Sequence, residues 1–471
     1  MSKMKIIILL PSLLLAACSA GPDYKRPDLT MPESWPAKQA GSGQKIGEAG
    51  EQWWRLYGDA VLDQLEQEAL SNNADIQIAA ARVQEVRAQL GITEADQYPV
   101  VTANINETRT KYSQLSGFPR ATQNLSHATL NASYEIDLWG KLRRASEAAR
   151  ATLLSAESAK DTVRLGLTAQ VAQQYFALLS LDGQEAAVGR ILAGRQERLE
   201  IARKQLEVGA ISEYDLHQIE ADVAAAQSQM ATINQARDKQ QAALALLLGR
   251  SPRDVMNSVL QRGTPSLPLA SVPDGLPAEL LLRRPDLKDA EQRLIAMNAN
   301  IGVARAQYFP TIGLTTYLGS ESTALAGMFT GPSGIFQFAA NISQPIFNAG
   351  RTGYMVDAAQ ARRDQALLQY KQAVASAFVD VRNALTAQEA ARQVLDSETR
   401  RSESLEQAYK QVELRYQVGM ISRLELLDVE RNLLQARLNR LDAERAQRSA
   451  VADLFKALGG GWQRTEPAKT K

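Results

Sequence analysis

Residues 208–212 read Val-Gly-Ala-Ile-Ser, and residues 418–422, which lie 210 positions later, read Val-Gly-Met-Ile-Ser. The match continues at this offset without a gap as far as Gly249 and Gly459, and upstream it continues at an offset of 211. A period of this length is far beyond the roughly 20 to 50 residues of a solenoid repeat. The sequence therefore predicts two domain-sized halves that build one pseudo-symmetric body.

The N-terminus has the pattern of a secretory signal. Lys3 and Lys5 precede an apolar run over residues 6–15, and Leu-Ala-Ala-Cys follows, ending at Cys18. The run is too short to span a bilayer, which takes about 20 apolar residues. Cys18 is the only cysteine, and its position resembles a bacterial lipobox, in which it becomes the first residue of the mature chain and carries an N-acyl and a diacylglycerol lipid. Ser19, in place of Asp, implies sorting to the outer membrane; the alternative is an incidental small residue in a signal peptide.

The composition argues against several classes of protein. The chain has 53 basic and 52 acidic side chains, so it lacks the electrostatic footprint of a nucleic-acid binder. The two histidines, His127 and His217, are isolated, and no phosphate-binding Gly-Lys-Ser/Thr run occurs. A catalytic triad or a histidine-rich metal site has little to build on, and we expect no enzyme.

Two segments predict unusually long helices. Residues 141–206 and 351–416 contain no proline and are rich in Ala, Gln, Glu, Arg and Leu, which have high helix propensity. Each would be close to 100 Å long at 1.5 Å per residue. A second helix follows each of them, with apolar residues at steps of three and four that are typical of coiled-coil packing. On the helices alone, an ordinary dimeric coiled coil remains possible.

Four shorter segments alternate in polarity: residues 100–111, 129–138, 311–318 and 335–346. A half-buried soluble sheet has the same period of two. Strands of about ten residues with one apolar face also suit an outer-membrane β-barrel, and Glu135 and Asp137 would then line its lumen. Four strands leave two open edges, and known single-chain barrels begin at eight strands, so several copies would have to share one barrel.

Together, the signal with its lipobox, Trp53-Trp54 ahead of Asp59, the duplicated strand and helix plan and the two Val-Gly-x-Ile-Ser turns resemble the outer membrane factor family, the OprM- and TolC-like channels. The resemblance implies a mainly α fold with a membrane β-barrel. It implies that a homotrimer forms a twelve-stranded barrel in the outer-membrane lipid, continued by a twelve-helix periplasmic tunnel with equatorial helices. It implies the exit duct of a tripartite pump, with a periplasmic adaptor (membrane fusion) protein and an inner-membrane transporter of the resistance-nodulation-division type as partners.

The expected organisation follows from the repeat. It comprises a signal peptide (1–17), a lipid-anchored extended leader (18–57), a first repeat (58–265) with strands near 99–112 and 127–138, a second repeat (266–462) with strands near 309–320 and 335–346, and a polar tail (463–471).

The two quoted turns are predicted helix hairpins, because Gly suits the left-handed position that ends a helix and Ser suits the N-cap of the next. The resemblance implies that the adaptor docks at these tips. The alternative is a turn that serves folding alone. The candidate docking residues are Val208, Gly209, Ala210, Ser212, Val418, Gly419, Met420 and Ser422.

The family also pinches its tunnel shortly after the second tip, where this chain carries Leu424, Glu425 and Asp428. A ring of Leu424 would exclude water, and a ring of Asp428 carboxylates would favour cations. The alternative for Asp428 is a solvated helix face. Glu425 has a rival and preferred explanation, a capping box with Ser422. Asp215, the first-half counterpart of Glu425, completes the candidate gate.

Arg415 and Tyr416, just before the second tip, are expected to hold the hairpins together. The basic residue that these channels often carry in the second tip is missing, because Met420 and Ile421 are apolar. Two other functions remain open: the exit duct of a protein secretion system, and a lipid-anchored periplasmic scaffold without a pore. The exported substrates, whether drug, solvent or metal, are not readable from the sequence.

Overall fold

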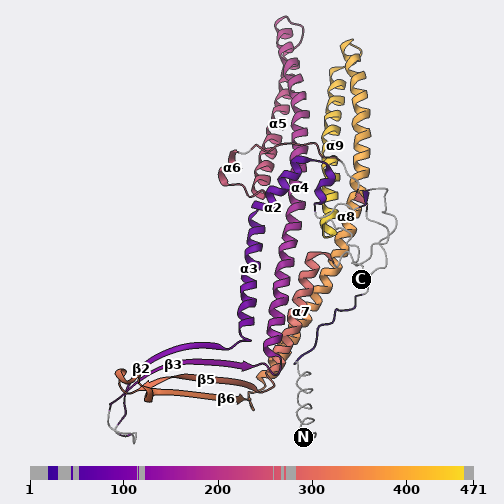
Figure 1. Ribbon diagram of the computed structural model, residues 1–471. Coiled ribbons are helices and arrows are strands. Elements are labelled where there is room, and N and C mark those ends of the chain that lie inside the picture. Colours follow the sequence, from indigo (N-terminus) through magenta and orange to yellow (C-terminus); the bar gives the residue numbers. More distant parts are fainter. Residues whose placement is uncertain are drawn as a thin grey trace, which may run out of the picture. The chain divides into compact units, whose positions relative to one another are not determined.

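The computed structural model describes residues 20–29, 44–45, 52–113, 115, 122–257, 259–266, 270–271 and 283–460 (Figure 1). The predicted signal peptide, Cys18, most of the leader and the polar tail lie outside these residues. The chain divides into two compact units. Unit 1 comprises Met1–Leu29, Ala81–Ser158 and Lys288–Gln372, and unit 2 comprises Thr30–Ala80, Ala159–Leu287 and Ala373–Lys471.

Helices make up most of the described chain. They are η3 (Trp53–Tyr57), α2 (Ala60–Asn72), α3 (Ala74–Ala95), α4 (Lys141–Glu207), α5 (Glu213–Leu247), α6 (Pro252–Asn257), α7 (Pro285–Ala306), η5 (Leu325–Gly327), η6 (Gly331–Ser333), α8 (Arg351–Gln417) and α9 (Arg423–Ala457). The long helices α4 and α8 have 67 residues each, which corresponds to about 100 Å. No described helix is both long and apolar enough to cross a bilayer.

Helices α4 and α8 begin in unit 1 and continue into unit 2, where they form helix hairpins with α5 and α9, respectively (Figure 1). Leu199 and Ala202 of α4 pack on Ile219 and Val223 of α5, so the apolar stripe of the second helix faces the first. Helix α4 continues through Gly183 without a break. A Cβ at this glycine would lie 2.8 Å from Cδ2 of Leu441 in α9, so the missing side chain allows close helix packing.

The aromatic residues ahead of α2 anchor the other end of unit 2. Trp53, Trp54 and Tyr57 are almost completely buried, and Trp53 stacks on Phe455 of α9 with ring centroids 5.3 Å apart. Asp59 then caps α2 by accepting a hydrogen bond from the Val61 backbone N–H at 2.8 Å. The sequence signature Trp-Trp followed by Asp is therefore a packing and capping device.

Unit 1 contains a four-stranded antiparallel sheet in the order β2-β3-β5-β6. The strands are β2 (Val100–Lys111), β3 (Thr122–Ile136), β5 (Thr311–Ser322) and β6 (Gly334–Ser343). Among the described residues, β2 and β6 each pair on one side only. They expose rows of unpaired backbone groups, which are a template for pairing with another chain. Unit 2 has a separate pair of two-residue strands, β1 (Gln44–Lys45) and β4 (Ala270–Ser271).

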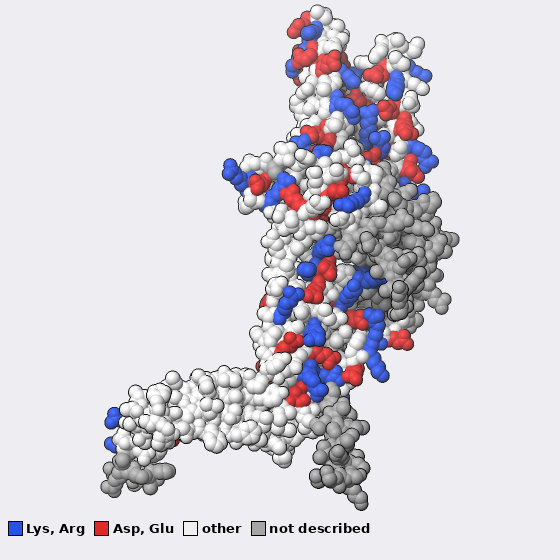
Figure 2. All heavy atoms as spheres, in the orientation of Figure 1, with Lys and Arg blue, Asp and Glu red and all other residues white. Residues whose placement is uncertain are grey.

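The sheet has one apolar and one polar face, because side chains alternate along each strand. Residues paired across the four strands show this directly. One row, on the apolar face, consists of Ala103, Leu130, Leu318 and Phe336. The row beside it, on the polar face, consists of Thr102, Asn131, Tyr317 and Gln337. Both faces are largely exposed in the single chain, and the sheet carries few charged side chains in Figure 2.

The second strand differs from its expected span. It begins at Thr122, before the expected start near residue 127, because its polar first residues continue the ladder with β2, in which Lys111 pairs with Thr122. It ends at Ile136 because Asp137 caps α4, accepting from the Leu142 and Arg143 backbone N–H groups at 3.1 and 2.9 Å. Asp137 therefore serves the start of a helix and lies outside the strand in which it was expected.

Candidate functional site

The first tip, between α4 and α5, is a tight helix hairpin. Gly209 has φ 75°, in the left-handed region that glycine adopts without steric cost. Its N–H donates to the Leu206 carbonyl at 2.9 Å, and the Ala210 N–H donates to the Gln205 carbonyl at 2.8 Å. These two bonds are those of a Schellman motif, which satisfies the last carbonyl groups of α4.

The second tip, between α8 and α9, repeats this geometry. Gly419 has φ 77°, and the N–H groups of Gly419 and Met420 donate to Tyr416 and Arg415 carbonyls at 3.0 and 2.9 Å. Apolar side chains project from both turns: Val208 is 79% exposed, Val418 68% and Met420 77%. Two rigid backbone turns thus present apolar side chains to the surroundings.

The two N-caps differ. At the first tip, the Ser212 hydroxyl oxygen accepts from the Asp215 N–H at 3.2 Å, and the Asp215 carboxylate accepts from the Ser212 N–H at 3.2 Å. This is a complete capping box, and hydrogen bonds from the Ser212 hydroxyl and N–H lower the pKa of Asp215. At the second tip, Ser422 accepts from the Glu425 N–H at 3.3 Å.

The Glu425 carboxylate makes no return bond to Ser422 among the described residues. The preferred interpretation, that the Glu425 side chain caps the start of α9, was therefore wrong. Only the Glu425 backbone N–H takes part in this cap. The complete box belongs to Asp215, its counterpart in the first repeat.

The other gate candidates lie exposed in the first turns of α9. Leu424 is 73% exposed. The Asp428 carboxylate lies 3.7 Å from the Arg431 guanidinium and accepts from the Asn432 amide at 3.3 Å, both on its own helix. One chain therefore brings no ring of these side chains together, and their neighbours in an assembly would have to come from other copies.

An ion-pair cluster around a buried glutamate joins the two hairpins near their tips. Glu430 of α9, whose side chain is 7% exposed, pairs with Arg195 and Arg198 of α4 at 3.3 and 2.9 Å. Arg195 also donates to the Asp222 carbonyl of α5 at 3.0 Å, and the Asp222 carboxylate lies 3.5 Å from the Arg423 guanidinium of α9. We call these five residues the hairpin link.

Sequence reasoning missed the hairpin link. One signal was present, because Glu430 lies within the apolar stripe of α9, four residues after Leu426, and a carboxylate there calls for a buried partner. The residues expected to join the hairpins, Arg415 and Tyr416, make no side-chain hydrogen bond or ion pair within the described part of one chain.

The N-terminal segment packs along unit 1. The Ala20 N–H donates to the Trp139 carbonyl at 3.0 Å, where β3 passes into α4. Gly21, with φ 100°, lies so close to Gly302 that a Cβ on it would be 2.4 Å from the Gly302 Cα. The start of the described chain is thereby held at the junction between sheet and helices.

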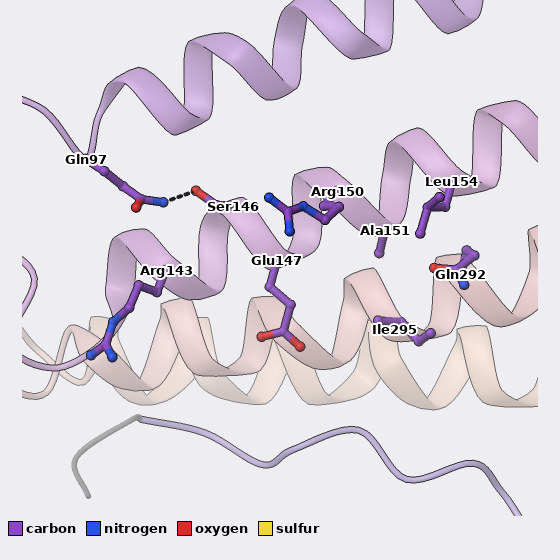
Figure 3. A pocket seen from close by; sticks show the side chains of 9 residues that line it. All are labelled: Gln97, Arg143, Ser146, Glu147, Arg150, Ala151, Leu154, Gln292 and Ile295. Atoms are coloured by element: carbon purple, nitrogen blue, oxygen red, sulfur yellow. Dashed lines mark hydrogen bonds between the residues drawn. The ribbon is translucent and has the colours of Figure 1, made fainter. Parts of the chain in front are cut away.

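Unit 1 also has an open hollow of ≈ 380 Å³ (Figure 3). Each charged side chain in it has a partner: Arg143 pairs with Asp137 at 3.2 Å, Arg150 with Glu94 at 3.0 Å and Glu147 with Arg144 at 2.7 Å. Gln97 donates to the Ser146 hydroxyl, as Figure 3 shows. The hollow offers no nucleophile beside a base, and no metal-binding cluster of His, Cys, Asp and Glu occurs among the described residues.

A family model described as "Outer membrane efflux protein" matches residues 65–250 and 276–460. The chain belongs to this family. The two matched segments correspond to the two repeats, and the family and mainly helical fold that the sequence indicated are confirmed.

Relatives match over nearly the whole length. The cation efflux system protein CusC of Escherichia coli O6:H1 is 35% identical over 473 residues, with 98% of this chain and 100% of the relative covered. The toluene efflux pump outer membrane protein TtgC of Pseudomonas putida is 33% identical over 469 residues, covering 98% and 96%. The crystal structure of the Campylobacter jejuni CmeC outer membrane channel matches with a TM-score of 0.85 and 26% identity, covering 96% of each chain.

These matches establish the general function. The protein is the outer-membrane channel of a tripartite efflux pump and not an enzyme. It lies in the bacterial outer membrane and extends into the periplasm.

Proposed function

We propose that three copies of this chain form one exit duct that is closed at the hairpin tips until pump partners open it. The sheet carries this proposal, because it combines one apolar face, one polar face and two unpaired edges. Pairing β6 of one copy with β2 of the next satisfies both edges. Three copies supply twelve strands, whose apolar faces meet the membrane lipid and whose polar faces line the lumen of a β-barrel.

The tips are the proposed docking surface for the periplasmic adaptor protein. Val208, Val418 and Met420 expose apolar side chains on turns whose backbone is fixed by Gly209 and Gly419. Rigid turns lose little conformational freedom on binding, which favours affinity. Ala210, Ser212 and Ser422 complete this surface, and the adaptor in turn connects to an inner-membrane transporter of the resistance-nodulation-division type.

The gate is proposed at the start of α9, with Leu424 as an apolar ring and Glu425 and Asp428 as carboxylate rings. Asp215 takes a smaller part, because its carboxylate is engaged with Ser212. The hairpin link holds α9 against α4 and α5 and so favours the closed arrangement. Opening would separate the charges of Glu430 and the two arginines.

We also propose that Cys18 carries the lipid anchor. Ala20, two residues later, is bonded to Trp139 at the membrane end of unit 1, so a lipid on Cys18 can enter the same bilayer as the strands. Changing Cys18 to Ala should abolish incorporation of labelled fatty acid. Persistent labelling of the variant would refute the assignment.

The polar face of the sheet suits a duct of low selectivity. Its side chains are mainly hydroxyl and amide groups, with His127 as its imidazole and Glu135 and Glu321 as its carboxylates. Relatives are named for efflux of cations and of toluene, and a wall of this kind accepts either. The transporter would then choose the substrate.

Purified protein in planar bilayers tests the pore. In detergent we expect the purified protein to have the mass of three chains. In planar bilayers we expect small, rare channel openings in the wild type and larger conductance in Asp428→Ala, where a carboxylate ring is lost. A scaffold without a pore gives no conductance in either protein. If the duct exports drugs or metals, deleting the gene should raise susceptibility to the exported compound. If the duct serves protein secretion, the deletion should instead deplete the culture medium of a secreted protein.

A further inference from the structure

The apolar face of the sheet ends at one level on all four strands. The row through Ala103 is apolar throughout, and the row through Ile105 is the last with an apolar residue on β2. Beyond this row, every residue on the same face of the sheet is polar or charged. Glu107 lies beside Ser126 and Ser322, Arg109 beside Asn124, and Lys111 beside Thr122. The change marks the outer limit of the band that meets hydrocarbon.

The charged residues beyond this limit share the face of the band. Glu107, Arg109 and Lys111 follow Ile105 at steps of two, so their side chains point to the same side of the sheet. Arg109 and Lys111 are exposed and have no ion pair among the described residues. In Figure 2 basic side chains appear on the sheet only toward one end.

In the channel proposed above, this end of the sheet lies at the outer leaflet. Helix α3 ends at Ala95 and β2 runs from Val100 to Lys111, so Arg109 lies roughly 30 Å along the strand from its helical end at 3.3 Å per residue. The helices extend into the periplasm, and the far end of the strand therefore reaches the outer surface of the membrane. Basic side chains at a bilayer midplane cost about 2–4 kcal/mol and are nearly free of cost at the interface.

Phosphate is the chemistry that fits these side chains. A guanidinium binds phosphate through two parallel hydrogen bonds, and an ammonium binds it as a point charge. Both side chains can also lay their apolar stems along the band while the charged ends stay among headgroups. Free phosphate has no acyl chains to lie against Ile105 and Leu130, which are exposed just below.

We propose that Arg109 and Lys111 form a binding site for the phosphorylated sugar headgroup of lipid A, the glycolipid of the outer leaflet. The proposal rests on the trimeric membrane channel proposed above. Glu107 lies on the same face, one step nearer the band, and weakens phosphate binding unless a divalent cation bridges the two. The site anchors β2, the strand at the open edge of the sheet.

Full-length trimer, purified in detergent with EDTA and freed of lipid, is titrated with lipid A while bound lipid is counted by native mass spectrometry. Each basic residue contributes about fivefold in affinity, so the double variant Arg109→Gln/Lys111→Gln should bind lipid A about 25-fold more weakly. Glu107→Gln should bind it more tightly. The matched control Arg253→Gln, an exposed arginine of α6 in unit 2, should match the wild type.

Two comparisons separate the sources of phosphate. Lipid A stripped of its phosphates should bind the wild type as weakly as intact lipid A binds the double variant, and millimolar inorganic phosphate should displace little intact lipid. Equal binding of the two lipids, displacement by inorganic phosphate, or an unchanged double variant would overturn the proposal. The mass and conductance of the same samples report on the channel independently, so a failed lipid site is distinguishable from a failed channel.

Discussion

Replacing Glu430 by Gln should open the channel without any partner. The carboxylate accepts charged hydrogen bonds from Arg195 and Arg198 at 3.3 and 2.9 Å and is 7% exposed. A hydrogen bond to a charged group contributes about 1.5–3 kcal/mol. Glutamine keeps one acceptor, and Arg198 is 39% exposed and partly screened, so we take the net loss as about 3 kcal/mol per chain.

If the hairpin link is made only in the closed arrangement, this loss shifts the ratio of closed to open hairpins by about 160-fold for each chain of the channel. Single-channel recording in planar bilayers measures it as open probability. Glu220→Gln is the matched control, because Glu220 occupies the same place in the first repeat but is 40% exposed with Arg203 at 3.7 Å. Such an exposed pair contributes less than about 1 kcal/mol. Equal open probabilities in the two variants, with lowered thermal stability in Glu430→Gln alone, would refute the reasoning and leave the link a folding contact.

Two further predictions concern stability in unit 2. Glu66 is completely buried without a hydrogen-bond partner among the described residues, and burial, with the Asp63 charge, raises its pKa well above the usual value. The stability that a raised pKa contributes is fully present only below the pKa of the unfolded chain, about 4.3. It is lost by about 1.4 kcal/mol per pH unit as the pH rises toward the pKa of the folded protein. Glu66→Gln should therefore raise the melting temperature at pH 7.5 but not at pH 4, and an equal gain at both would contradict the sign. Glu68→Gln is its control and should lower stability, because Glu68 pairs with Arg250 at 2.7 Å. Gly419→Ala should cost about 1–2 kcal/mol, because φ is 77° although space is open. Gly331→Ala, which also has open space but no positive φ, should be neutral in the same melting assay, and similar losses would exclude backbone strain as the cause.

The sequence predicted those parts of the fold that depend on local chemistry. The spans of α4 and α8 follow from propensity and from the absence of proline, and the tip glycines follow from the need for a positive φ. The early start of β3 did not follow, because Thr122 and its neighbours lack an alternating pattern. Their place in the sheet comes from backbone pairing with β2, and the pattern of their side chains does not predict this pairing.

The hairpin link was beyond sequence reasoning for a different reason. Glu430 stood out in an apolar stripe, but Arg195 lies 235 residues away, and α4 offers several arginines. Which of them faces α9 depends on how the helices rotate against each other, and small residues such as Gly183 set that packing. Long-range pairs of this kind need the assembled helices.

The two repeats share a backbone but divide the work at the tips. In the first, Asp215 closes a capping box and Glu220 is exposed. In the second, Glu425 is not tied to its own helix start and Glu430 is buried between two arginines of the first. The second hairpin therefore offers two exposed carboxylates, Glu425 and Asp428, for a gate, while the first supplies the cations that hold it. An adaptor that binds the tips equally well in both arrangements opens nothing. It must favour the open one by more than the hairpin link contributes, of which the Glu430 carboxylate alone supplies about 3 kcal/mol per chain.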